Sequence, residues 1–161
     1  MKKKEEAVAI SLKLKQRLTR NSFGAVENAL LIAKNSGARI YLDRDYRIII
    51  LSPSLIKSTD IYRRTIRIAK EMEKLLIEHN AKFKDKIDFG IGLSSGEIIS
   101  EARGKEFKFT SVGNIISVAK KVSGFSEGEM LISNSVRAKV AGKFKFEKGK
   151  SEGVWKLKNK K

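Results

Sequence analysis

Two short groups of polar residues in this chain could do chemistry. Ser117 and Lys121 lie four residues apart after Gly113, and this spacing places a hydroxyl and an ammonium group on one face of a predicted helix. Asp43 and Asp45 lie in a charged segment between two β-branched and aromatic runs, which predicts a hairpin whose turn carries acids. The chain therefore offers a cationic helix face and an acidic turn, and the elements around them must bring them into position.

The surrounding sequence alternates between strand and helix patterns. We predict strands at 7–15, 87–93, 97–102, 107–112 and 130–133, and hairpins at 39–53 and 143–158. We predict helices from Asn21 or Ser22 to about Gly37, at 61–80, at 114–122, and from Asn134 or Ser135 onward. This order predicts an α+β fold with one mixed sheet and with helices on one face of it.

Length and composition indicate one strongly basic domain. We expect residues 1–161 to form a single domain with its own core, and residues 1–6 and 158–161 to be frayed basic tails. The net charge of +17 produces a positive field that attracts nucleotides, nucleic acid or acidic membranes alike, so charge does not choose the partner. A solvated lysine-rich surface would explain the same charge.

Several kinds of site are excluded by the residues that the sequence lacks. There are no cysteines, which excludes disulfides, thiolate metal sites and cysteine nucleophiles, and the single His79 cannot form a multi-histidine site. No apolar run approaches the roughly 20 residues that span a bilayer, and the first residues do not form a signal peptide. We expect a cytoplasmic protein.

The region 88–136 carries a series of motifs with characteristic spacing. The motifs are Gly90-Ile91, Gly96-Glu97, Gly104, Phe109-Thr110 and Gly113. Their order and spacing resemble the catalytic domain of class III nucleotidyl cyclases, strongly over 88–136 and more weakly from about residue 29. The resemblance implies a ferredoxin-like βαββαβ core that pairs head-to-tail, as a homodimer or heterodimer, with substrate between two copies. The element order predicted from periodicity agrees with that fold.

The resemblance also implies two metal-binding carboxylates, one on the first strand and one in the hairpin turn. The turn position matches Asp45, with Asp43 two residues before it, and these are the residual metal ligands that we predict. The first-strand position falls near Lys13, whose ammonium would repel a cation but could hold a phosphate as a point charge. Glu5 and Glu6 lie upstream and could supply the acid only if the alignment of the first strand were shifted.

The transition-state and base-binding positions of the family are altered as well. Ser117 and Lys121 match an Asn and an Arg that orient the ribose and stabilise charge on the transferring phosphoryl group. Lysine lacks the bidentate fork of arginine and serine is shorter than asparagine, so we expect catalysis to fall by orders of magnitude. In the base pocket, Thr110 matches a residue type seen in adenine-reading members, whereas Tyr41 stands where the family has lysine.

We therefore predict a catalytically inactive cyclase-like domain that acts in intracellular signalling as a nucleotide- or phosphate-binding, or dimerising, regulatory module. One alternative is a divergent adenylate or guanylate cyclase that is active with a partner subunit. A second is a basic nucleic-acid-binding module that uses the cations of 63–74 and of the C-terminal tail. We assign no cofactor unless the domain is active, in which case Mg or Mn is implied.

Overall fold

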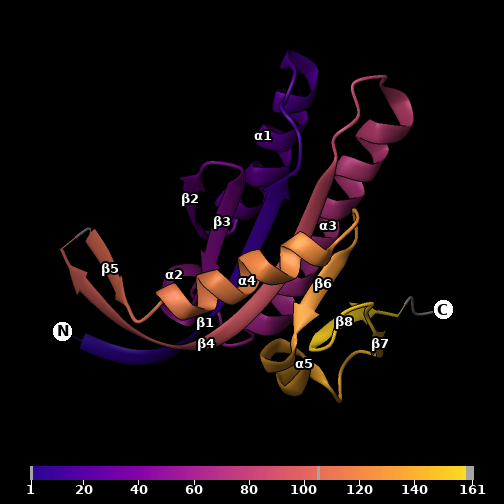
Figure 1. Cartoon of the computed structure of the whole chain (residues 1–161). Helices are drawn as coiled ribbons and strands as arrows, with labels where there is room; N and C mark the ends of the chain where they lie inside the picture. The colour runs from indigo at the N-terminus through magenta and orange to yellow at the C-terminus, as the bar shows by residue number, and fades with distance from the viewer. Residues whose placement is uncertain (1, 105, 159–161) are drawn as a thin grey trace.

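The strands of the described residues form one sheet of eight strands (Figure 1). The computed structural model describes residues 2–104 and 106–158. The strands are β1 (Lys2–Leu14), β2 (Arg39–Asp43), β3 (Tyr46–Leu51), β4 (Phe89–Arg103), β5 (Glu106–Thr110), β6 (Met130–Ser133), β7 (Phe146–Lys148) and β8 (Val154–Leu157). The helices are α1 (Arg20–Asn35), α2 (Pro53–Ile56), α3 (Ile61–Lys82), α4 (Gly113–Phe125) and α5 (Asn134–Val140).

The order of the strands confirms the predicted ferredoxin-like core. Neighbouring strands follow the order β2-β3-β1-β4-β6-β8-β7, and β5 pairs with β4 alone. The first four strands of this order are antiparallel, with α1 connecting β1 to β2 and α3 connecting β3 to β4, which is the βαββαβ arrangement. β6 then pairs with β4 in parallel, so the sheet is mixed as predicted.

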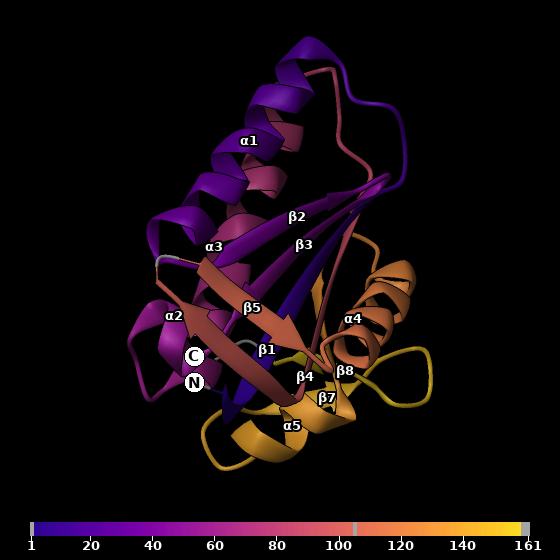
Figure 2. The same ribbon diagram turned by 90° about the vertical axis from the view of Figure 1, so that its left-hand side faces the viewer.

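Helices cover both faces of the sheet, so the prediction that they lie on one face was wrong. Figure 2 shows α1 and α3 on one side of the strands and α4 on the other. The reason is visible in β1, where both alternating sets of side chains are buried. Val8 and Ile10 enter the core beneath α1 and α3, whereas Ala7 and Ala9 enter a smaller cluster beneath α4. A strand buried on both faces needs a layer on each of them.

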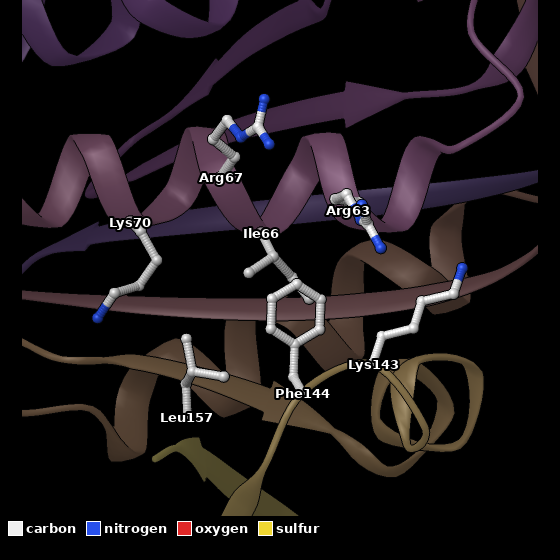
Figure 3. Close-up of a pocket in the computed structure, with 7 residues that line it drawn as sticks. All are labelled: Arg63, Ile66, Arg67, Lys70, Lys143, Phe144 and Leu157. Atoms are coloured by element: carbon white, nitrogen blue, oxygen red, sulfur yellow. The ribbon is translucent and has the colours of Figure 1, made fainter. Parts of the chain in front are cut away.

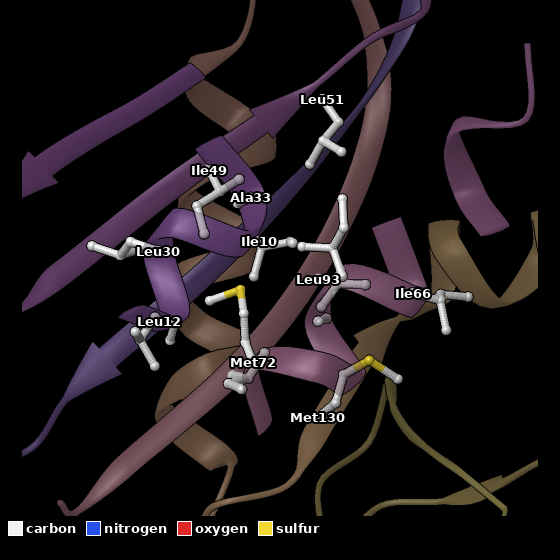
Figure 4. Packing of buried hydrophobic residues seen from close by; sticks show 14 of the residues in the cluster. Ile10, Leu12, Leu30, Ala33, Ile49, Leu51, Ile66, Met72, Leu93 and Met130 are labelled. Carbon is white, nitrogen blue, oxygen red and sulfur yellow. The ribbon is translucent and has the colours of Figure 1, made fainter. Parts of the chain in front are cut away.

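The larger core lies between the sheet and the α1, α3 and α5 helices (Figure 4). β-Branched and leucine side chains of the central strands meet the apolar stripes of α1 and α3, with Met72 and Met130 filling the space between them. Ile10, Ile49 and Leu93 are fully buried there. Phe23, by contrast, which fits the predicted apolar stripe of α1, is 51% exposed.

The two ends of the chain and the centre of β4 differ from the sequence-based prediction. Residues 2–6 form the start of β1 and pair with β4, so they are not a frayed tail. Lys158 donates its backbone N–H to the carbonyl of Lys145 at 2.8 Å, whereas residues 159–161 of the predicted tail lie outside the described residues. The two runs predicted at 87–93 and 97–102 belong to one continuous strand, β4, which begins at Phe89 and passes through the connection predicted between them. In the described ranges no helix combines the length and apolarity needed to cross a membrane.

Candidate functional site

The predicted acidic turn joins β2 to β3 and lies beside the end of β1. Lys13 of β1 is paired in register with Tyr46 of β3, and Tyr46 is paired with Asp43 of β2. The backbone N–H of Leu14 donates to the carbonyl of Asp45 at 2.7 Å, which fixes the turn against β1. Because directly opposed residues in antiparallel strands share a face of the sheet, Lys13, Tyr46 and Asp43 form one row across three strands.

Lys120 of α4 contacts two residues of this row. The Lys120 ammonium forms an ion pair with the Asp43 carboxylate and lies 4.9 Å from the centroid of the Tyr46 ring. Lys13 Nζ lies 5.7 Å from the same centroid, so the Tyr46 ring forms cation–π contacts with both Lys13 and Lys120. The hydrogen bond and charge of Lys120, with a smaller contribution from Arg44, hold the pKa of Asp43 below its ordinary value. Asp43 is therefore neutralised from within the chain.

These residues do not fit a divalent cation. A two-metal site needs several carboxylates around each ion. Here Asp43 is already paired with Lys120, and the other two positions of its row are Tyr46 and Lys13. Among the described residues, no group of three or more His, Cys, Asp and Glu side chains is arranged to hold a metal. The exposed Asp45 is the remaining carboxylate of the turn.

Glu5 and Glu6 cannot supply the missing acid, because they lie at the other end of β1. Eight residues of extended strand separate Glu5 from Lys13, a distance of about 26 Å. Glu5 is instead held by α2 and β4, where its carboxylate accepts hydrogen bonds from the Ser54 N–H at 3.0 Å and from the hydroxyls of Ser54 and Ser100. Burial opposes ionisation of Glu5, but these hydrogen bonds outweigh it and lower its pKa.

The other predicted site residues lie at the surface around α4 and the neighbouring strands. Ser117 and Lys121 are both exposed on α4, and Thr110 is exposed at the end of β5, where its hydroxyl donates to the Ile99 carbonyl at 3.4 Å. Within the described part of the chain, none of these three side chains forms a hydrogen bond or an ion pair with the acidic turn. Tyr41 is 42% exposed on the edge strand β2, two residues before Asp43 and on the same face.

Two glycines of β4 allow α4 to lie close enough for Lys120 to reach the turn. A Cβ at Gly90 would lie 2.1 Å from the Ser123 carbonyl oxygen, and a Cβ at Gly92 would lie 2.3 Å from the Ser123 nitrogen. The helix backbone thus packs directly on the strand backbone at alternate positions of β4. The Ser123 hydroxyl also hydrogen-bonds the Ser11 hydroxyl of β1 at 2.9 Å, which ties α4 to the central strand.

Sequence reasoning missed Lys120 and Tyr46. Lys120 precedes Lys121, which drew attention because it matches a motif position, and the helical face alone does not show which of the two reaches the sheet. The ion pair joins residues 77 positions apart, so no local pattern reveals it. Tyr46 could have been found, because the predicted turn places it directly after Asp45 at the start of a strand.

The chain has the fold of a class III nucleotidyl cyclase catalytic domain. Neither a protein-family model nor a curated protein matches its sequence. One similar structure is the guanylate cyclase domain of RhGC from Catenaria anguillulae in complex with GTP, with a TM-score of 0.70 and 19% identity over 99% of this chain and 100% of that chain.

Two further structures are similar over nearly the whole chain. A non-canonical dimeric guanylyl cyclase domain of the RhoGC fusion protein from the aquatic fungus Blastocladiella emersonii has a TM-score of 0.68 and 18% identity, over 97% of this chain and 94% of that chain. The adenylyl cyclase CyaB from P. aeruginosa has a TM-score of 0.67 and 13% identity, over 100% and 97% respectively. At such identities the likeness extends to the fold, and the chemistry has to be argued from this chain's own residues.

Proposed function

We propose that this chain is a cyclase-like domain without cyclase activity, which serves as a dimerising, phosphate-binding regulatory module. The observation that carries the proposal is the ion pair of Lys120 with Asp43 beside Lys13. A cyclase of this fold needs divalent cations to activate the ribose hydroxyl and to hold the triphosphate. Here an ammonium group of the chain already neutralises one of the two candidate carboxylates, and a second ammonium repels an incoming cation.

The same cations support binding of a phosphate without a metal. Three cationic side chains surround the turn and its carboxylates of Asp43 and Asp45: Lys13 on β1, Arg44 in the turn itself, and Lys120 on α4. Lys13 forms no ion pair with any described residue, so its ammonium is available to an anion. Phosphate oxygens accept charge-assisted hydrogen bonds from lysine.

An activity assay tests the proposal directly. Purified protein incubated with ATP or GTP and Mn²⁺ is expected to form no cyclic nucleotide, whereas Mn²⁺-dependent product that Asp45→Ala abolishes would overturn the proposed inactivity. Sedimentation of the full chain tests the dimer, which the head-to-tail pairing of the cyclase fold supports, and a monomer over the whole micromolar range would remove that part. Product formed only after mixing with a second cyclase-like chain that has intact acids would favour the heterodimer alternative.

A further inference from the structure

A second cationic site lies between α3 and the C-terminal part of the chain, away from the acidic turn. A cavity of about 350 Å³ opens there (Figure 3), within the range of about 300–1,000 Å³ that is typical of small-molecule sites. Because α3 and α4 cover opposite faces of the sheet, this cavity shares no residue with the row of Lys13, Tyr46 and Asp43. It requires an explanation of its own.

Among the described residues, the polar side chains that line the cavity are all cationic. Arg63, Arg67 and Lys70 come from successive turns of one face of α3, and Lys143 comes from the turn after α5. Arg63 lies 3.6 Å from a carboxylate oxygen of Asp60, and Lys70 pairs with Glu73 at 2.7 Å. In the part of the chain that the structure describes, Arg67 and Lys143 form no salt bridge, and no acidic side chain lines the cavity.

The floor of the cavity is apolar and held in place by the fold. Ile66 belongs to the main core, and Phe144 and Leu157 pack against that core from the C-terminal segment. The backbone N–H of Phe144 donates to the Val140 carbonyl at 3.2 Å, and its ring lies 6.3 Å from that of Phe146, which pairs with Leu157 across the hairpin. Figure 3 shows the Phe144 ring against Ile66, with Lys70 and Lys143 extending to either side of it and Arg67 extending from the far side of α3.

We propose that this cavity binds a nucleoside phosphate without a metal ion. The cations of the lining, among which Arg67 and Lys143 form no salt bridge with a described residue, supply the charge that neutralises the phosphate, which a divalent cation would otherwise supply. Phe144 and Leu157 supply an apolar surface for the planar base. A hollow with an apolar floor suits a small ligand, whereas an extended nucleic acid backbone is contacted by a row of solvated cations and requires no such floor.

Calorimetric titration of the full chain with ADP in the presence of EDTA tests this proposal. We expect one ADP per chain, with inorganic phosphate and adenosine each binding more weakly than ADP. Arg67→Gln combined with Lys143→Gln should weaken ADP binding about tenfold or more, because each change removes a charge-assisted hydrogen bond. Phe144→Leu keeps an apolar side chain but removes the aromatic ring, so it should weaken ADP binding and leave phosphate binding unchanged.

A matched variant separates a built site from general positive charge. Lys82→Gln combined with Lys148→Gln removes two exposed charges from α3 and β7 without touching the cavity, and it should bind ADP like the wild type. The proposal would be overturned if both double variants lost ADP binding equally, or if the wild type bound no ADP. It would also be overturned if the chain preferred a single-stranded RNA whose binding both double variants weakened alike. A third double variant, Lys13→Gln with Lys120→Gln, tests the acidic turn. If this variant lost ADP binding while Arg67→Gln with Lys143→Gln bound ADP like the wild type, the proposal would be overturned and phosphate binding at the acidic turn would be supported.

Discussion

Gly92→Ala should displace α4 and disrupt the contacts around the acidic turn. An added Cβ would lie 2.3 Å from the Ser123 nitrogen and 2.6 Å from the Ala119 carbonyl oxygen, both of them helix backbone. β4 cannot retreat, because Gly92 pairs with Ser11 in the middle of the sheet. Comfortable non-bonded contact needs about 3.5 Å, so the helix has to move by roughly 1 Å.

The magnitude follows from the rigidity of the two backbones. Overpacking a core generally costs about 1–3 kcal/mol, and we expect the upper end because no flexible side chain can absorb the clash. For a chain of 161 residues this corresponds to a fall in melting temperature of about 6–12 °C. The displacement also weakens the hydrogen bond between Ser11 and Ser123 and draws Lys120 away from Asp43.

Thermal unfolding followed by circular dichroism measures the effect, with Gly24→Ala as the matched control. Gly24 lies in α1, and a Cβ there would meet nothing within 4 Å. That substitution should stabilise the protein by about 1 kcal/mol, because alanine is the better helix former. A Gly92→Ala protein that melts with the wild type would show that α4 does not pack as tightly on β4 as described, and the positioning of Lys120 would lose its basis.

Two further perturbations test the charged contacts. Lys120→Ala should raise the pKa of Asp43 toward its ordinary value. Because this pKa is lowered in the folded protein, the ion pair stabilises the fold above the unfolded-state pKa of Asp43, and that stabilisation is lost as the pH falls through the folded-state pKa. A carboxyl ¹³C titration that gives the same Asp43 pKa in the variant and the wild type would contradict the contact. Glu5→Gln should lower the free energy of unfolding at pH 7 by about 1–3 kcal/mol in urea titrations, because it removes a charged acceptor from the half-buried Ser54 and buried Ser100 donors. Since the pKa of Glu5 is lowered too, the gap between wild type and Gln variant should close as pH falls below about 4, and a gap that persists at pH 2 would count against this assignment.

The sequence was sufficient to predict the core of the fold because strand and helix periods are local properties. The hairpin turn at Arg44 and Asp45 and the helix starting near Gly113 were predicted within a few residues. The number of layers was not predicted correctly. A strand such as β1 is buried on both faces, but its sequence contains enough polar residues to resemble a strand with one solvated face. The alternation of Leu12 and Lys13 indicates a solvated face, and the structure shows that face meeting α4 through Ser11.

The site could be predicted only as far as motif positions reach. Asp43 and Asp45 follow from the turn pattern, but the partner that neutralises Asp43 depends on how α4 crosses the sheet, and that crossing is a tertiary property. No sequence motif predicts the cavity between α3 and Phe144, because its lining residues come from α3 and from a segment more than 70 residues later in the sequence. Long-range pairs of this kind are set by topology, which local patterns constrain weakly.

The glycines of β4 are constrained by backbone packing, whereas the charged residues around the acidic turn are not. Gly90 and Gly92 are required wherever a helix backbone rests on β4, whether or not the domain performs a reaction, because any side chain there would collide with Ser123. A metal ligand has no such steric role, so Lys13 and Lys120 can make the local charge positive without disturbing this packing. The glycine motifs therefore indicate the fold of this chain, whereas the cations around Asp43 bear on whether the acidic turn can bind a metal.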